Sequence, residues 1–155
     1  DGSASIPFIW SFPKALPQGK VIAAPVMNLD VFPTLCDLCG LPKPPTLEGR
    51  SLVPLMSGAE DGLDRAALSE NYRDGFAGRM IRTPRWKYFF YTDDEEYLYD
   101  MQADPGEEHN LARDPLHRAV VDELKRKASV GWVDAAPKAA SKADKKAKKQ
   151  AKKPL

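Results

Sequence analysis

Residues 79–111, RMIRTPRWKYFFYTDDEEYLYDMQADPGEEHNL, decide the fold of the second half of this chain. Short runs rich in aromatic and β-branched residues are separated there by turn-forming pairs such as Thr83-Pro84 and Asp93-Asp94. This alternation is typical of short strands joined by tight turns. With one further run before it, the pattern predicts an antiparallel sheet of about four strands. The predicted strands cover residues 66–71, 79–83, 87–92 and 97–101.

A helix is predicted to follow the sheet. Asp114 and Pro115 supply a capping carboxylate and then a proline at the first helical position, where its missing N–H costs least. Apolar residues then recur every four positions and predict a stripe that covers one face of the sheet. The stripe consists of Leu116, Val120, Leu124 and Ala128. We expect the globular part to end near Trp132.

The first half of the chain has a different pattern. Residues 6–12, IPFIWSF, form a nearly continuous apolar run before Pro13, which predicts a strand buried on both faces of a mostly parallel sheet. Residues 51–58 predict one or two helical turns, with Leu52, Leu55 and Met56 on one side. An apolar run that starts so near Asp1, with no signal peptide before it, is typical of a fragment of a longer protein.

Residues 28–40 predict a helix. Asn28 or Asp30 is the expected cap, and Gly40 followed by Pro42 is the expected stop. Apolar residues recur at helical spacing and predict one apolar face made of Leu29, Phe32, Leu35 or Cys36, and Cys39. The two cysteines form a lone CxxC pair, which we interpret as small apolar residues rather than as a redox or zinc site.

Charge is distributed unevenly along the chain. Residues 135–155 carry eight lysines and one aspartate, which is a net charge of +7. Because the whole chain has a net charge of +1, the remaining residues have a net charge of −6. The tail has few large apolar residues and is predicted to be disordered or loosely helical. We do not expect nucleic acid as a partner, because no aromatic residues stand among the lysines. No stretch is apolar for the ~20 residues that a membrane span requires.

A collinear series of short motifs resembles the sulfatase family. No one of them is decisive alone, but their order is that of the C-terminal part of sulfatases over about residues 6–132. The motifs are IPFI at 6–9, DVFPTL at 30–35, LCG at 38–40, GRSL at 49–52, RMIRT at 79–83, RWKY at 85–88, LYD at 98–100 and DPGEEHNL at 104–111.

The resemblance implies an alkaline-phosphatase-like α/β fragment, with the last part of the large sheet followed by a C-terminal α+β subdomain. The expected domains are residues 1–65, 66–133 and, for the tail, 134–155. Sulfatases use a formylglycine, made in a CxPSR-type motif, and a calcium ion held by carboxylates and an asparagine. Such groups provide an activated nucleophile and cationic stabilisation of the sulfuryl oxygens. No motif here matches CxPSR, so no catalytic residue and no metal ligand is carried over to this chain.

Substrate contacts are expected at the end of the first predicted strand of the sheet. Sulfated substrates are anionic, so a cationic group in a loop on a rigid scaffold is a reasonable contact. The candidate substrate-binding residues are Asn71, Tyr72, Arg73 and Arg79. The competing interpretation is structural: Arg82 and Lys87 pair with carboxylates across the sheet, and Glu107 and Asn110 cap a turn.

Three functions remain open from the sequence. The leading hypothesis is the C-terminal fragment of a sulfatase, inactive alone, whose parent hydrolyses sulfate esters of small molecules or carbohydrates. A phosphodiesterase or phosphonate monoester hydrolase of the same superfamily is the second. A non-catalytic module that binds an anionic polymer through its basic tail is the third. The resemblance implies a periplasmic or secreted location.

Overall fold

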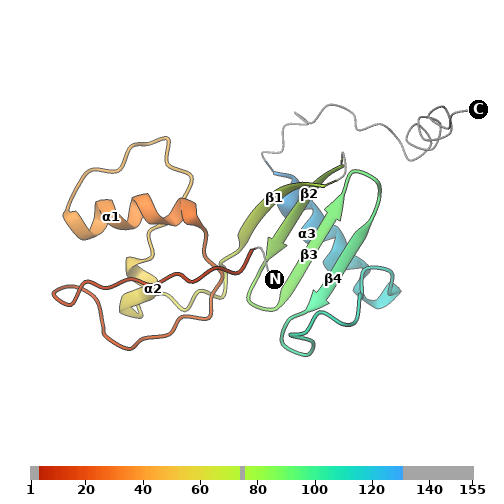
Figure 1. Ribbon diagram of the computed structural model, residues 1–155, viewed down its shortest axis with the longest axis horizontal. Helices are drawn as coiled ribbons and strands as arrows, with labels where there is room; N and C mark the ends of the chain where they lie inside the picture. The colour runs from red at the N-terminus through yellow and green to blue at the C-terminus, as the bar shows by residue number, and fades with distance from the viewer. Residues whose placement is uncertain (1–3, 74–75, 131–155) are drawn as a thin grey trace, which may run out of the picture. The chain divides into compact units, whose positions relative to one another are not determined.

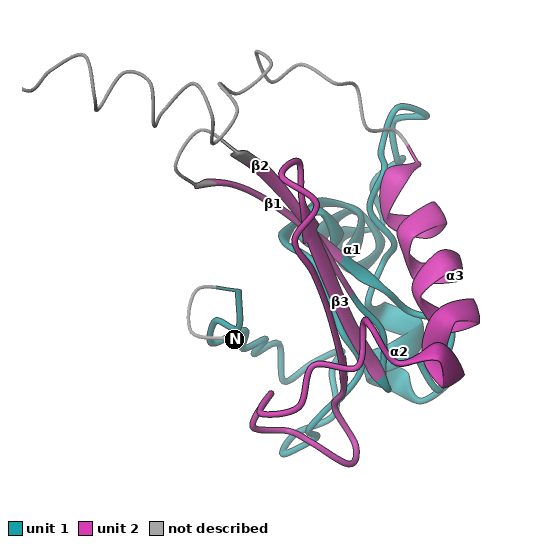
Figure 2. Ribbon diagram, turned by 90° about the vertical axis from the view of Figure 1, so that its right-hand side faces the viewer, with its two compact units in different colours: residues 1–67, 82–85 teal, residues 68–81, 86–155 magenta. Residues whose placement is uncertain are grey.

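The structure is a computed structural model that describes residues 4–73 and 76–130, without the side chains of residues 73 and 76 (Figure 1). It divides into two compact units, drawn in different colours in Figure 2. Unit 1 consists of residues 1–67 and 82–85, and unit 2 of residues 68–81 and 86–155. The expected domain limits remain a prediction, and the tail at 134–155 lies outside the described residues.

Unit 1 contains a 3-10 turn, η1 (Asn28–Asp30), and two helices, α1 (Val31–Cys39) and α2 (Val53–Ser57). Gly40 ends α1 in the left-handed conformation, with φ of 62°, which glycine adopts without steric cost. The core is small and consists of Leu16, Leu52, Leu55 and Met56. The prediction of a short helix with Leu52, Leu55 and Met56 on its inner side is therefore confirmed.

The predicted strand over residues 6–12 does not form. This segment has no regular secondary structure, and Ile6 and Ile9 are 65% and 89% exposed. A strand needs a neighbour to complete its ladder of hydrogen bonds. Among the described residues, nothing pairs with this run, so its apolar composition alone does not make it a strand.

The predicted apolar face of α1 is buried only at Cys36, and the helix also buries Pro33 and Thr34. Phe32 is 52% exposed and Leu35 43%, and Cys39 is exposed as well. The helical period was found correctly, but most of the apolar face lies on the solvent side, and Leu38 packs against the core of unit 1.

Unit 2 is a four-stranded antiparallel meander with a helix on it (Figure 1). The strands are β1 (Ala67–Arg73), β2 (Phe76–Arg82), β3 (Trp86–Tyr91) and β4 (Glu96–Asp100), in the order β1-β2-β3-β4. The register of the last pair places Tyr88 opposite Leu98 and Phe89 opposite Tyr97. The four predicted strands are confirmed, with ends that differ by a few residues.

Helix α3 (Arg118–Ser129) lies against one face of this sheet in both views (Figures 1 and 2). It follows a 3-10 turn, η2 (Pro115–His117), in which the Asp114 side chain accepts the Leu116 N–H as predicted. The buried side of the helix is Val121, Leu124 and Ala128, whereas the predicted stripe began at Leu116, which is 87% exposed. Because the 3-10 turn η2 has three residues per turn, Leu116 is rotated away from the buried side of α3.

No helix in the described part of the chain is both long enough and apolar enough to span a membrane.

Candidate functional site

A buried carboxylate, Asp30, joins the start of α1 to the segment before α2. Asp30 is 3% exposed; its Oδ2 accepts the Met27 N–H at 3.0 Å and its Oδ1 accepts the Arg50 N–H at 2.8 Å. The guanidinium of Arg65 lies 3.6 Å from Oδ2. A buried charge is tolerated when it is paired and hydrogen-bonded. Asp30, predicted as a helix cap, is thus the point where the DVFPTL and GRSL segments meet.

Thr34 and Gly49 complete this junction. The Thr34 hydroxyl donates to the Asp30 carbonyl at 2.5 Å and accepts the Leu52 N–H at 2.9 Å, and its side chain is fully buried. A Cβ at Gly49 would collide with the backbone of Leu29. The close approach of the two segments therefore requires glycine at this position.

Arg65 and its acidic partner Glu60 line a cavity of about 530 Å³ beside this junction. Arg65 Nη2 donates to the Ser51 carbonyl at 2.8 Å and to Glu60 Oε2 at 3.0 Å. Arg50 pairs with the same Glu60 and, at 3.2 Å, with Asp64. The Nε of Arg65 is buried with no hydrogen-bond partner in the structure. The cavity is thus lined by charges of both signs that mostly neutralise one another.

Asp37 on the rim of this cavity is a poor candidate for a catalytic base. Its pKa lies below the usual value of 3.8, because the Ser51 hydroxyl and then the Lys43 ammonium hydrogen-bond to its carboxylate. A general base near neutral pH needs a pKa close to the operating pH.

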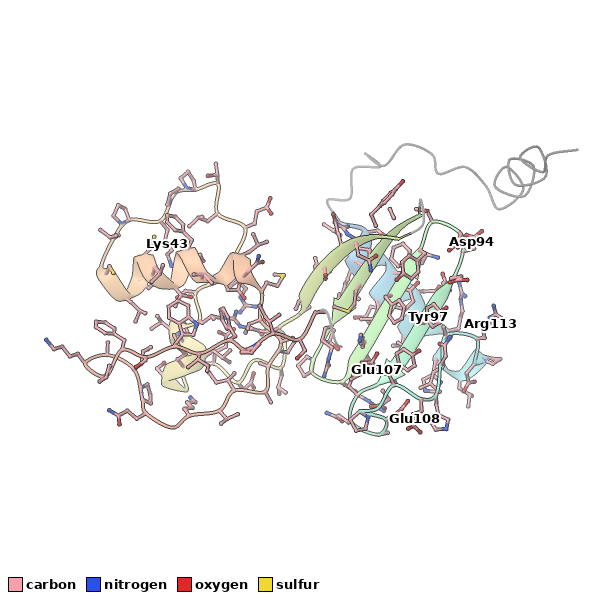
Figure 3. The ribbon with its side chains drawn as sticks, in the orientation of Figure 1. Lys43, Asp94, Tyr97, Glu107, Glu108 and Arg113 are labelled. Carbon is pink, nitrogen blue, oxygen red and sulfur yellow. The ribbon has the colours of Figure 1, made fainter. Side chains whose placement is uncertain are left out.

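In unit 2, the DPGEEHNL segment fastens the end of the sheet. Asp104 accepts the N–H groups of Glu108 and His109 at 3.1 and 2.8 Å, and these bonds lower its pKa. Asn110 Oδ1 accepts from Leu98 and Ala112, each at 3.0 Å, so the loop is bound directly to β4. Figure 3 labels Tyr97 on β4 and Glu107 in this loop. The structural interpretation of Asn110 is therefore the one that the geometry supports.

Lys87 and Glu107 form a partly buried ion pair between β3 and that loop. Lys87 Nζ lies 2.7 Å from Glu107 Oε2, and the two side chains are 6% and 18% exposed. Burial alone would raise the pKa of Glu107, but the hydrogen bonds and charge of Lys87 contribute to a net lowering of that pKa below its usual 4.5. Glu107 holds a positive φ of 60°, so the pair fixes a backbone conformation that glutamate rarely adopts.

The structure does not bring Asn71, Tyr72 and Arg79 onto one surface. Asn71 is exposed and its amide lies 3.4 Å from the Tyr91 hydroxyl, over Gly78. Tyr72, the next residue along β1, points to the opposite face of the sheet and is 59% exposed. Arg79 is 7% exposed and bonds to Glu70 and to the carbonyls of Ala128 and Val130. The Arg73 side chain lies outside the described residues, and substrate contact by these four stays a prediction.

The described residues do not fit the calcium site that the resemblance implies. In residues 4–73 and 76–130, no group of three or more His, Cys, Asp or Glu side chains could hold a metal ion. Cys36 is buried and Cys39 is exposed, and neither stands in a CxPSR-type motif. No chemical step through calcium or formylglycine is therefore derived from these residues.

Comparisons with known proteins agree with this architecture. The chain is 34% identical over 157 residues to a Δ4,5-hexuronate-2-O-sulfatase of Bacteroides thetaiotaomicron, covering 89% of this chain and 33% of that protein. A solved complex with the substrate D-glucosamine-2-N,6-O-disulfate matches with a TM-score of 0.67 and 30% identity, over 77% of this chain and 26% of that one. The phosphonate monoester hydrolase of Agrobacterium radiobacter matches with a TM-score of 0.52 and 33% identity, over 63% and 23%.

The fold is that of the C-terminal part of an alkaline-phosphatase-like sulfatase, with a four-stranded antiparallel sheet and a C-terminal helix. The N-sulphoglucosamine sulphohydrolase C-terminal family matches residues 1–130, and the chain belongs to this family. It spans a third or less of the length of the relatives and structures compared above.

Sequence reasoning missed the role of Arg65. Its partners Asp30 and Ser51 are 35 and 14 positions away, so no local pattern reveals the pairing. A signal was present in the DVFPTL motif. Its polar residues Asp30 and Thr34 stand among apolar residues in the predicted helix. Buried polar residues of that kind require partners.

Proposed function

We propose that this chain is the C-terminal portion of a sulfatase that hydrolyses sulfate esters of carbohydrates. The observation that carries the proposal is the family match over residues 1–130. The names of two similar proteins support the substrate class, since one is a hexuronate 2-O-sulfatase and the other binds a disulfated glucosamine. The chain's own role is then to provide scaffold and substrate contacts, while calcium and formylglycine are held by the rest of the enzyme.

A phosphonate monoester hydrolase is the second candidate. The similarity to the Agrobacterium enzyme supports it, because 33% identity is close to the identity with the sulfatase relative. Both reactions require an activated oxygen nucleophile and cationic stabilisation of a tetrahedral oxyanion group. The difference between them lies in residues that this chain does not supply.

The test compares two proteins on two substrates. The complete product of the gene and the 155-residue chain alone are assayed with a sulfated disaccharide and with a phosphonate monoester. We expect the complete product to release sulfate with higher kcat/KM than it cleaves the phosphonate, and we expect no turnover by the chain alone. Faster cleavage of the phosphonate would replace the first candidate by the second, and no turnover of either substrate would refute both.

A further inference from the structure

The chain carries a strongly basic C-terminal segment beyond the part that the family match covers. The match ends at residue 130, and residues 135–155 hold eight lysines and a single acid, Asp144, which is a net charge of +7. We call residues 135–155 the lysine tail, which lies outside the described residues. Its lysines are Lys138, Lys142, Lys145, Lys146, Lys148, Lys149, Lys152 and Lys153.

The point from which the tail departs is fixed on unit 2. The carbonyl of Val130, the last described residue, accepts from Arg79 Nη1 at 3.3 Å, and the carbonyl of Ala128 accepts from the same nitrogen. Arg79 belongs to β2 and is 7% exposed, so charged hydrogen bonds tie the end of α3 to the sheet. The tail begins five positions after Val130, which limits its start to about 18 Å from that anchor even in a fully extended chain. A ligand that the tail binds is therefore brought to unit 2.

The tail and the rest of the chain have opposite net charges. Residues 1–134 carry −6 and the tail carries +7, so the total of +1 describes neither part. At physiological salt the Debye length is about 8 Å, so an exposed charge acts mainly on groups within that distance. A polyanion is therefore attracted locally by the tail, whereas the acidic remainder of the chain does not attract it.

The composition of the tail favours a sulfated polymer as its ligand. Lysine binds anions as a compact point charge without the fixed fork of arginine, and the tail contains no arginine. Binding by such a segment depends on the number and density of anionic groups, which a sulfated polysaccharide presents repeatedly. Single-stranded nucleic acids gain affinity by stacking on aromatic side chains, and interfacial helices use large apolar residues. The tail has no aromatic residue, and its only large apolar residue is Leu155.

We propose that the lysine tail binds sulfated polysaccharide by electrostatic attraction and holds the enzyme on a polymeric substrate. The identity of the ligand rests on the proposed function, because a sulfated carbohydrate would be both the ligand of the tail and the substrate of the catalytic part. Tethering of this kind raises the effective concentration of sulfate esters near the catalytic part without changing the chemical step.

Binding of the 155-residue chain to dextran sulfate, with unsulfated dextran as the reference, tests the proposal without turnover. Two variants each remove four positive charges. The tail variant carries Lys145→Gln, Lys146→Gln, Lys148→Gln and Lys149→Gln. The control variant carries Lys14→Gln, Lys43→Gln, Arg85→Gln and Arg113→Gln at exposed positions outside the tail. We expect the tail variant to bind dextran sulfate about tenfold or more weakly and the control variant to bind within about twofold of the unmodified chain. The salt dependence of binding should fall in the tail variant only.

Equal weakening by the two variants would show that net charge alone matters and would overturn the proposal, as would unchanged binding by the tail variant. Tighter binding of the unmodified chain to single-stranded DNA or to phosphatidylserine vesicles, at equal concentration of anionic groups, would identify a nucleic acid or a membrane as the ligand and would also overturn it.

The complete gene product separates this proposal from the proposed function. There the tail variant should raise KM for a sulfated polysaccharide and leave kcat/KM for a sulfated disaccharide unchanged. An unchanged KM for the polymer would contradict the tethering role. Absence of sulfate release from either substrate would refute the proposed function, and the dextran sulfate measurement would still decide whether the tail binds sulfated polymers.

Discussion

The two units differ in how they treat their apolar residues. In unit 2, Tyr88, Leu98 and Val121 are completely buried between the sheet and α3. In unit 1, the cluster of buried apolar residues has four members, and ten of the fourteen exposed large apolar side chains of the described residues lie there. A domain needs a sufficient buried apolar area to offset the entropy of ordering its chain. Unit 2 meets this requirement from its own residues, whereas unit 1 has a small core and depends more on its polar junction.

The largest expected effect concerns the polar junction of unit 1. Asp30→Ala leaves the Arg65 guanidinium buried beside a lost carboxylate, which typically destabilises by about 3–5 kcal/mol. Denaturant unfolding followed by helical circular dichroism should show this loss. The matched control is Glu48→Ala at an exposed position of unit 1, for which we expect a change within about 0.5 kcal/mol. Equal behaviour of the two variants would show that the junction does not hold unit 1 together.

The second prediction concerns the core of unit 2. Leu98→Ala removes a side chain with no exposed area and should destabilise by about 2–5 kcal/mol, since the packed sheet cannot close the cavity completely. Leu116→Ala, at an exposed position just before α3, is the control and should change stability little. Thermal unfolding of both variants measures the difference, and a small effect of Leu98→Ala would mean that α3 does not cover the sheet tightly.

A smaller effect is expected at Asn110. Asn110→Ala removes the acceptor for the N–H groups of Leu98 and Ala112, at a cost of about 1–3 kcal/mol. Asn110→Asp keeps an acceptor oxygen at that place, so it should lose only part of the stability that Asn110→Ala loses. Chemical denaturation separates the two variants. If Asn110→Asp were as unstable as Asn110→Ala, the acceptor role of the side chain would be refuted.

The smallest effect is a dependence on pH from the pair of Lys87 and Glu107. The pKa of Glu107 is lowered in the folded state, so its contribution to stability is present above the usual value of 4.5. That contribution is lost as the pH falls below 4.5 through the folded-state pKa. Lys87→Met should flatten this part of the curve of unfolding free energy against pH. If Lys87→Met left the slope of unfolding free energy against pH unchanged below pH 4.5, the pair would make no such contribution.

The sheet of unit 2 was predictable because its signals are local. The runs from Trp86 to Tyr91 and from Glu96 to Asp100 are separated by turn residues, and strand pairing between neighbours in sequence needs no distant information. The cap of Asp114 was predictable for the same reason. The error at Leu116 arose because a 3-10 turn, which the periodicity of an α-helix does not anticipate, precedes α3.

Unit 1 was harder to predict because its contacts join distant residues. Periodicity located the apolar face of α1 correctly but could not show that Phe32 and Leu35 on this face are exposed. The role of Asp30 depends on Arg50 and Arg65, which are 20 or more positions away. The candidate substrate residue Arg79 was chosen for its charge, and only the fold shows that its guanidinium bonds to Glu70 and to the end of α3.

Amide hydrogen exchange on the isolated 155-residue chain tests the contrast between the two units most directly. Local stability follows the apolar contacts that protect each element. We predict that the amides of β3 and β4, such as those of Tyr88 and Leu98, exchange about a hundredfold more slowly than those of Leu35 and Cys36 in α1. Equal protection of α1 and the β3–β4 pair in the isolated chain would contradict the account, since the small core of unit 1 would then protect its helix as well as the core of unit 2 protects the sheet.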